Sequence, residues 1–187
     1  ILVSFSIILI LLLAFIWWSE STSKKKRYIN SENFIKAKVF LSKDNNFESL
    51  ELLKNIVDRK DKVYSPLALF LIIDRNLESN EENITKYFDQ VLSIKGLEEE
   101  DKNLLKLKKA IYISENAEEK DILNLLNPVL NSESVWKYQI LKFLGDYYFS
   151  KKEFNKAKQY YSDILVLESS NKDLIEINRK IKIIENE

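Results

Sequence analysis

The chain has no cysteine and no histidine, and it contains only two glycines and two prolines among 187 residues. A protein without cysteine and histidine has no thiol nucleophile, imidazole base, disulfide or structural zinc site. Gly96 and Gly145 lie far apart in the sequence, so no glycine-rich loop is available to hold a phosphate group. Carboxylates, lysines and tyrosines are abundant but show no catalytic spacing. We therefore expect a protein that binds rather than catalyses, without a metal or cofactor.

The charged residues balance, with 29 lysines and arginines against 29 aspartates and glutamates, so no overall charge favours nucleic acid as a partner. Four basic residues are consecutive, namely Lys24, Lys25, Lys26 and Arg27, and the residues from Tyr28 onward carry a net charge of −3. Proteins that bind nucleic acid have a basic domain rather than a basic connector. The charge distribution therefore argues against nucleic acid binding.

Residues 1–18 form an almost entirely apolar run that ends in Trp17 and Trp18. As a helix this run would be about 27 Å long, close to the ~30 Å hydrocarbon thickness of a bilayer. The alternative, a cleaved signal peptide, would have a shorter apolar core and a cleavage site of small residues. We expect a retained single transmembrane helix, with both tryptophans and the basic run 24–27 at the membrane interface.

The rest of the chain is predicted to be all-helical, since it lacks the glycine and proline of sheet turns and repeats Leu, Ile, Lys and Glu at helical spacing. Similar segments follow short polar clusters, and the apolar residues Phe47, Ile84, Ile122 and Phe154 at or next to their starts are spaced by 37, 38 and 32 residues. Such a period is typical of stacked helical hairpins. The predicted domains are a transmembrane anchor over 1–18, a basic polar connector over 19–30 and an α-solenoid like the tetratricopeptide repeat (TPR) over 31–187.

The solenoid is expected to contain about four helical hairpins and a C-terminal capping helix. The predicted helices cover residues 31–42, 47–59, 66–77, 81–94, 101–114, 118–126, 135–149, 153–167 and 172–185. Ser65 is predicted to cap the helix that begins at Pro66, and Pro128 to end another helix near Asn127.

The last predicted hairpin matches the TPR at seven positions, which are Leu141, Leu144, Gly145, Tyr148, Phe154, Ala157 and Tyr161. Gly145 and Ala157 are expected to be the close contacts, because a larger side chain would push the two helices apart. The alternative is an ordinary helical hairpin filled by aromatic residues. The three earlier pairs keep the period but lack the small residues.

Several segments occur in a characteristic order after the apolar run: Val63-Tyr64-Ser65-Pro66-Leu67-Ala68, residues 104–129, Val135-Trp136, Leu144-Gly145-Asp146 and Phe154-Asn155-Lys156-Ala157. This arrangement resembles the YfgM-type ancillary subunit of the bacterial SecYEG translocon. The resemblance implies an inner-membrane protein whose repeat domain lies in the periplasm beside the Sec channel. It further implies cooperation with a membrane-anchored periplasmic chaperone of the prolyl-isomerase type on unfolded exported polypeptides.

The basic run after the apolar segment would by itself place the domain in the cytoplasm, because lysine and arginine favour the cytoplasmic flank. That rule compares both flanks, and we expect further residues before Ile1, since the sequence has no methionine. The function expected from the resemblance is a membrane-tethered interaction module that assists translocation by binding partners or unfolded clients. The alternatives are a structural scaffold of another envelope assembly, such as cell division or cofactor assembly, and a cytoplasm-facing adaptor.

Solenoids of helix pairs present a concave groove lined by the first helix of each pair. The groove positions predicted from the register of the last repeat are Gln139, Lys142, Asp146, Phe149, Leu107, Ala110, Leu69, Ile72 and Asn76. Residues 67–73 are apolar all round, however, which is also typical of a buried helix. Lys142 and Asp146 also fit a solvated ion pair one turn apart.

Aromatic residues of the last pair are further candidates for partner contact. In the repeat register Tyr148 and Tyr161 point inward, which leaves Tyr147 and Tyr160 as the expected exposed contacts. Trp136 is also a candidate, although an aromatic side chain of this size more often anchors the core.

Overall fold

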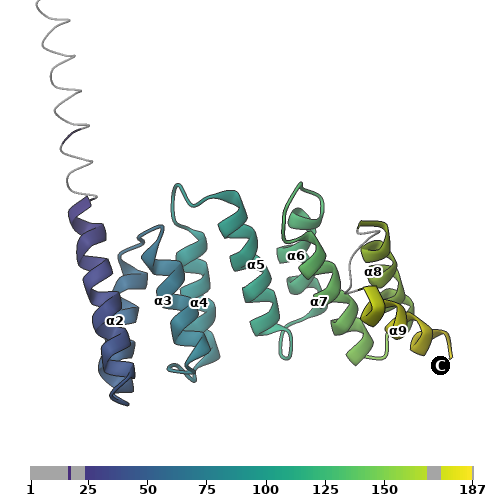
Figure 1. The fold of residues 1–187 in the computed structure, drawn as a ribbon, viewed down its shortest axis with the longest axis horizontal. Helices are drawn as coiled ribbons and strands as arrows, with labels where there is room; N and C mark the ends of the chain where they lie inside the picture. The colour runs from purple at the N-terminus through teal and green to yellow at the C-terminus, as the bar shows by residue number, and fades with distance from the viewer. Residues whose placement is uncertain (1–16, 18–23, 168–173, 187) are drawn as a thin grey trace, which may run out of the picture. The chain divides into compact units, whose positions relative to one another are not determined.

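The computed structural model describes residue 17, residues 24–167 and residues 174–186. These residues form helices joined by short turns, and no strand occurs among them, which confirms the all-helical prediction (Figure 1). The predicted transmembrane segment lies outside the described residues, apart from Trp17. Of the helices described, none combines the length and the apolar character needed to span a bilayer. The chain divides into two compact units, unit 1 (Ile1–Gly96) and unit 2 (Leu97–Glu187).

Unit 1 contains a helix over residues 24–41, followed by α2 (Asn46–Asp58), α3 (Tyr64–Asp74) and α4 (Glu81–Leu92). Successive helices run in opposite directions (Figure 1). The ring centroids of Phe34 and Tyr64 lie 6.0 Å apart, and this contact joins the first helix to α3. Helix α3 packs against both α2 and α4, and its apolar side chains form the centre of the unit 1 core.

The start of α3 differs from the predicted cap. The helix begins at Tyr64, and Asp61 Oδ1 accepts hydrogen bonds from the amides of Val63 and Tyr64, each at 2.9 Å. Ser65 already lies inside the helix, where its buried hydroxyl donates to the carbonyl of Ile56 at 2.7 Å. The prediction that Ser65 caps the helix is therefore wrong, because a carboxylate four residues earlier satisfies the first free amides.

Unit 2 contains α5 (Glu99–Ile113), α6 (Glu119–Leu130), α7 (Lys137–Ser150), α8 (Phe154–Leu167) and α9 (Leu174–Glu185). Each of these helices packs against the next one along the chain. The prediction that Pro128 ends its helix near Asn127 is wrong, since α6 continues to Leu130 with the proline inside it. The amide of Asn131 still bonds to the Asn127 carbonyl at 3.0 Å, so the last turn is maintained beyond the proline.

The hairpin of α7 and α8 is held together by small and aromatic residues, as the repeat pattern predicts. A Cβ atom added to Gly145 would lie 2.6 Å from Cδ1 and 3.0 Å from Cζ of Tyr161, so only glycine leaves room for this ring. Ala157 on α8 is fully buried. The rings of Tyr148 and Tyr160 stack with centroids 5.5 Å apart and planes at 3°.

Candidate partner-binding surface

Four of the predicted groove residues are buried in the cores of their own units. Leu69 and Ile72 in α3 have no exposed surface, and neither does Ala110 in α5, while Leu107 is 4% exposed. The assignment of these four residues to an open groove is therefore wrong. In unit 1, α2 and α4 both pack on α3, and in unit 2 the two α5 residues join a cluster with residues of α6, α7 and α8.

Three other predicted groove residues retain accessible surface. Gln139, in the first turn of α7, is exposed. Asn76 is exposed just after α3, with a φ of 49° that lets its amide bond to the Ile73 carbonyl at 3.0 Å. Phe149 is half-buried and packs edge-on against Phe154, with centroids 5.8 Å apart. Asn76 belongs to unit 1, whereas Gln139 and Phe149 belong to unit 2.

The predicted pair Lys142 and Asp146 belongs to a network of charges that joins α7 to α9. Lys142 Nζ lies 3.2 Å from Asp146 Oδ2 and 3.3 Å from Glu176 Oε1. Lys180 pairs with Asp146 and lies 3.4 Å from Glu176. The Tyr161 hydroxyl donates to Asp146 Oδ1 at 2.7 Å. The pair is therefore more than a solvated contact within one helix, because side chains of α9 occupy this side of α7.

Lys142, Asp146 and Glu176 keep their charges at neutral pH. Burial alone would raise the pKa of Asp146, but hydrogen bonds from Lys180, Tyr161 and Lys142 outweigh it and lower this pKa. The hydrogen bond from Lys142 also lowers the pKa of Glu176. Burial would lower the pKa of Lys142, yet its bonds to the two carboxylates raise it. Groups held in their charged forms in this way suit the attachment of α9 better than proton transfer.

The aromatic candidates are only partly accessible. Tyr147 is 6% exposed, so the prediction that it contacts a partner directly is wrong. The ring centroids of Tyr147 and Tyr148 lie 5.2 Å apart, and the Lys151 ammonium lies 4.4 Å from the Tyr147 ring centroid. Tyr160 is half-buried. Trp136 is half-buried as well, and its Nε1 donates to the Glu100 carbonyl at 3.1 Å, which fixes the segment before α7 to α5.

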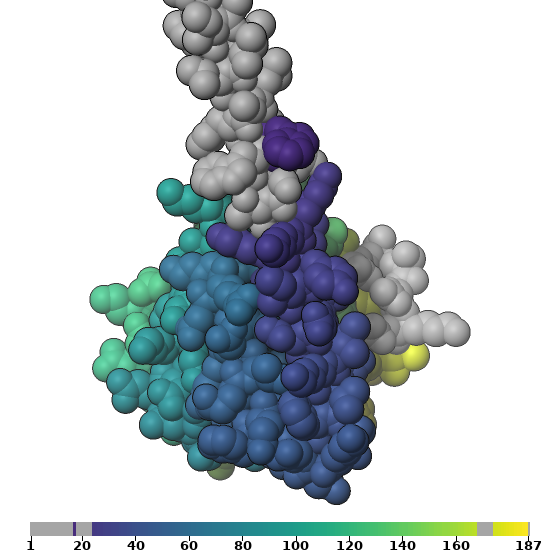
Figure 2. All heavy atoms as spheres, turned by 90° about the vertical axis from the view of Figure 1, so that its left-hand side faces the viewer, coloured from purple at the N-terminus to yellow at the C-terminus, as the bar shows by residue number. Residues whose placement is uncertain are grey.

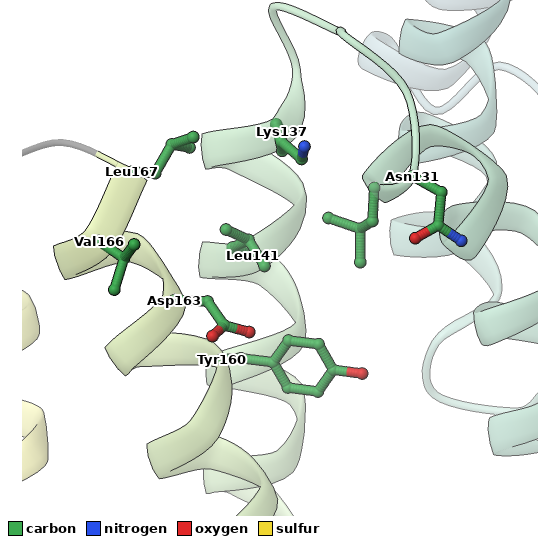
Figure 3. A pocket seen from close by; sticks show the side chains of 8 residues that line it. Asn131, Lys137, Leu141, Tyr160, Asp163, Val166 and Leu167 are labelled. Carbon is green, nitrogen blue, oxygen red and sulfur yellow. The ribbon is translucent and has the colours of Figure 1, made fainter.

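Unit 2 has a hollow of about 510 Å³ that the sequence reasoning missed (Figure 3). Its lining comes from the C-terminal end of α6, the N-terminal half of α7 and the C-terminal half of α8. The lining residues are Leu130, Asn131, Lys137, Leu141, Tyr160, Asp163, Val166 and Leu167. Val166 is 86% exposed and Leu167 is 45% exposed. The hollow therefore presents apolar side chains to solvent next to two charged ones.

The charged side chains of the hollow have opposite signs and come from different helices. Lys137 projects from α7 and Asp163 from α8 (Figure 3). Neither forms an ion pair with another described residue. An apolar surface bordered by one unpaired cation and one unpaired anion suits a peptide segment, whose side chain is apolar and whose backbone offers both acceptors and donors.

Comparisons of the chain with protein-family models, with curated proteins and with solved structures found no match. In the part of the chain that the structure describes, no group of three or more carboxylates could hold a metal ion.

Proposed function

We propose that the chain is a membrane-tethered, TPR-like interaction module of the YfgM type, which assists protein translocation or folding at the exit of the SecYEG channel. In this proposal the apolar residues 1–18 hold it in the bacterial inner membrane, and the helical domain lies in the periplasm. It works by binding, without catalysis. Its partners are the translocon, a membrane-anchored periplasmic chaperone and unfolded exported polypeptides.

The single observation that carries this proposal is the hollow of unit 2. Leu130, Leu141, Val166 and Leu167 supply apolar surface, and the volume of about 510 Å³ lies within the roughly 300–1,000 Å³ range of ligand pockets. An unfolded polypeptide exposes apolar side chains that a folded protein buries. One such side chain would occupy the hollow while Lys137 and Asp163 bind neighbouring backbone carbonyl and amide groups.

The second candidate function is a scaffold or adaptor of another envelope assembly, with the helical domain facing the cytoplasm. The observation in its favour is the basic run 24–27, which follows the apolar segment directly. Basic residues at that flank favour a cytoplasmic location. The two candidates differ in the proteins that the hollow should contact.

Site-specific photocrosslinking in native membranes tests the proposal. A photoreactive amino acid replacing Val166 should capture translocon subunits, a periplasmic chaperone or exported polypeptides. The matched control replaces Lys120, which is exposed at the start of α6 and does not line the hollow, and it should capture several-fold less. Equal capture from both positions would contradict binding at the hollow. Capture only of division, cofactor-assembly or cytoplasmic proteins would support the second candidate instead.

A further inference from the structure

Three separate segments of unit 1 bring basic side chains to one end of its helices. Because successive helices alternate in direction, the start of the helix over 24–41, the loop after α2 and the exit of α4 meet there. They line a cavity of about 270 Å³. Its basic residues are Lys26, Arg27, Arg59, Lys60, Lys62 and Lys95. Figure 2 shows this unit, with residues 24–41 in purple and α2 and α3 in blue.

The positive charge of this cavity is largely uncompensated. Its lining includes one acidic residue, Asp61, whose Oδ1 atom already accepts the amides of Val63 and Tyr64. None of the six basic side chains forms an ion pair with another described residue. A concave surface lined by charge of one sign concentrates ions of the opposite sign. The cavity therefore suits an anionic group.

A second observation indicates that the ligand donates a hydrogen bond to the protein. Asn30 also lines the cavity and is 1% exposed. Its Oδ1 atom is buried and finds no donor among the described residues. A buried acceptor without a partner costs free energy, and a hydroxyl group beside the bound anion would remove that cost.

The basic cavity also lies close along the chain to the apolar segment. Lys26 follows Trp18 by eight residues, which span at most about 28 Å even when fully extended. At the other end of unit 1, residues 74–82 include four acidic residues and one basic residue. The positive charge is therefore concentrated at the end that the apolar run precedes in sequence.

We infer that this cavity binds the headgroup of an anionic phospholipid of the phosphatidylglycerol class at the membrane surface. The basic side chains contact the phosphate, and a glycerol hydroxyl donates to Asn30 Oδ1. The inference rests on the membrane tether of the proposed function but not on the Sec channel as a partner. It extends the predicted membrane interface from the run 24–27 to the residues of the α2–α3 loop and to Lys95.

The test uses the full chain in lipid nanodiscs. Since the chain has no cysteine, an environment-sensitive dye on Val63→Cys reports the loop beside the cavity. Added phosphatidylglycerol should produce a saturating change of fluorescence that phosphatidylcholine does not produce. Free glycerol 3-phosphate and inorganic phosphate should need at least about tenfold higher concentrations, because they lack the membrane that concentrates the lipid at the site.

Two triple variants of equal charge change test the residues. Arg59→Gln/Lys60→Gln/Lys62→Gln should raise the half-saturating fraction of phosphatidylglycerol about tenfold or more. Lys36→Gln/Lys38→Gln/Lys43→Gln removes three exposed basic residues that do not line the cavity and should change this fraction less than about twofold. All six residues are exposed, and thermal unfolding of both variants checks that unit 1 stays folded.

Equal responses to the two lipids, or equal losses in the two variants, would overturn the inference. So would an equal response to free glycerol 3-phosphate in discs without phosphatidylglycerol, which would identify a soluble phosphate ester as the ligand. These results leave the proposed function intact. A chain that is not retained by the nanodiscs would contradict both proposals, because both require the membrane tether.

Discussion

Leu69→Ala is expected to lower the free energy of unfolding by about 2–5 kcal/mol, the usual cost of truncating a buried leucine. Leu69 is fully buried in α3, between helices α2 and α4. Its loss removes apolar contacts and leaves a cavity that packed helices fill only in part. Chemical denaturation of the full chain in mild detergent, followed by circular dichroism, measures the change.

Leu67→Ala is the matched control for this prediction. Leu67 lies on the same helix two residues earlier and is 43% exposed. Its truncation should cost less than about 1 kcal/mol, since much of the side chain already contacts water. Similar small losses in both variants would place Leu69 at a surface and restore it as a groove residue.

Gly145→Leu is expected to destabilise unit 2 by about 1–3 kcal/mol through overpacking. Even the first atom of the new side chain would lie 2.6 Å from Cδ1 of Tyr161. The ring cannot easily move, because it is fully buried and its hydroxyl bonds to Asp146 Oδ1 at 2.7 Å. Thermal or chemical unfolding of the full chain reports the loss.

A double-mutant cycle with Tyr161→Ala identifies the cause of that loss. In the background without the ring, Gly145→Leu should cost much less, because the space that it needs is vacant. An equal cost in both backgrounds would mean that the glycine serves another purpose than contact with Tyr161. The packing of α7 against α8 would then have to be explained without the repeat pattern.

The positions of most helices could be predicted from the sequence because they follow local signals, although the first helix begins at residue 24 rather than 31 and α6 extends to Leu130 rather than to residue 126. The predicted helix over 81–94 corresponds to α4, and Asn80 caps it by accepting the amides of Glu82 and Asn83. The predicted helix over 153–167 corresponds to α8, which begins at Phe154 and ends at Leu167. Polar clusters between apolar periodic segments sufficed for these boundaries.

The accessible surface could not be predicted in the same way, because it depends on contacts between distant segments. The repeat register places Lys142 and Asp146 on an inner face but does not reveal that Glu176 and Lys180 of α9 would pair with them. The hollow of unit 2 likewise requires the ends of three helices to meet. The one local sequence signal for this hollow is Val166 on α8. It is an apolar residue on the second helix of the last pair, whereas the predicted groove is lined by the first helix of each pair.

The most direct test of the central proposal is the affinity of the full chain for a permanently unfolded polypeptide, with Val166 or Val135 replaced by aspartate. Val166 lines the hollow and is 86% exposed, whereas Val135 is 72% exposed and lies outside the lining. Both substitutions add the same charge to an exposed valine. If the hollow binds apolar side chains, Val166→Asp should weaken binding about tenfold and Val135→Asp less than about twofold. Equal affinities of the two variants would contradict the hollow as the binding surface.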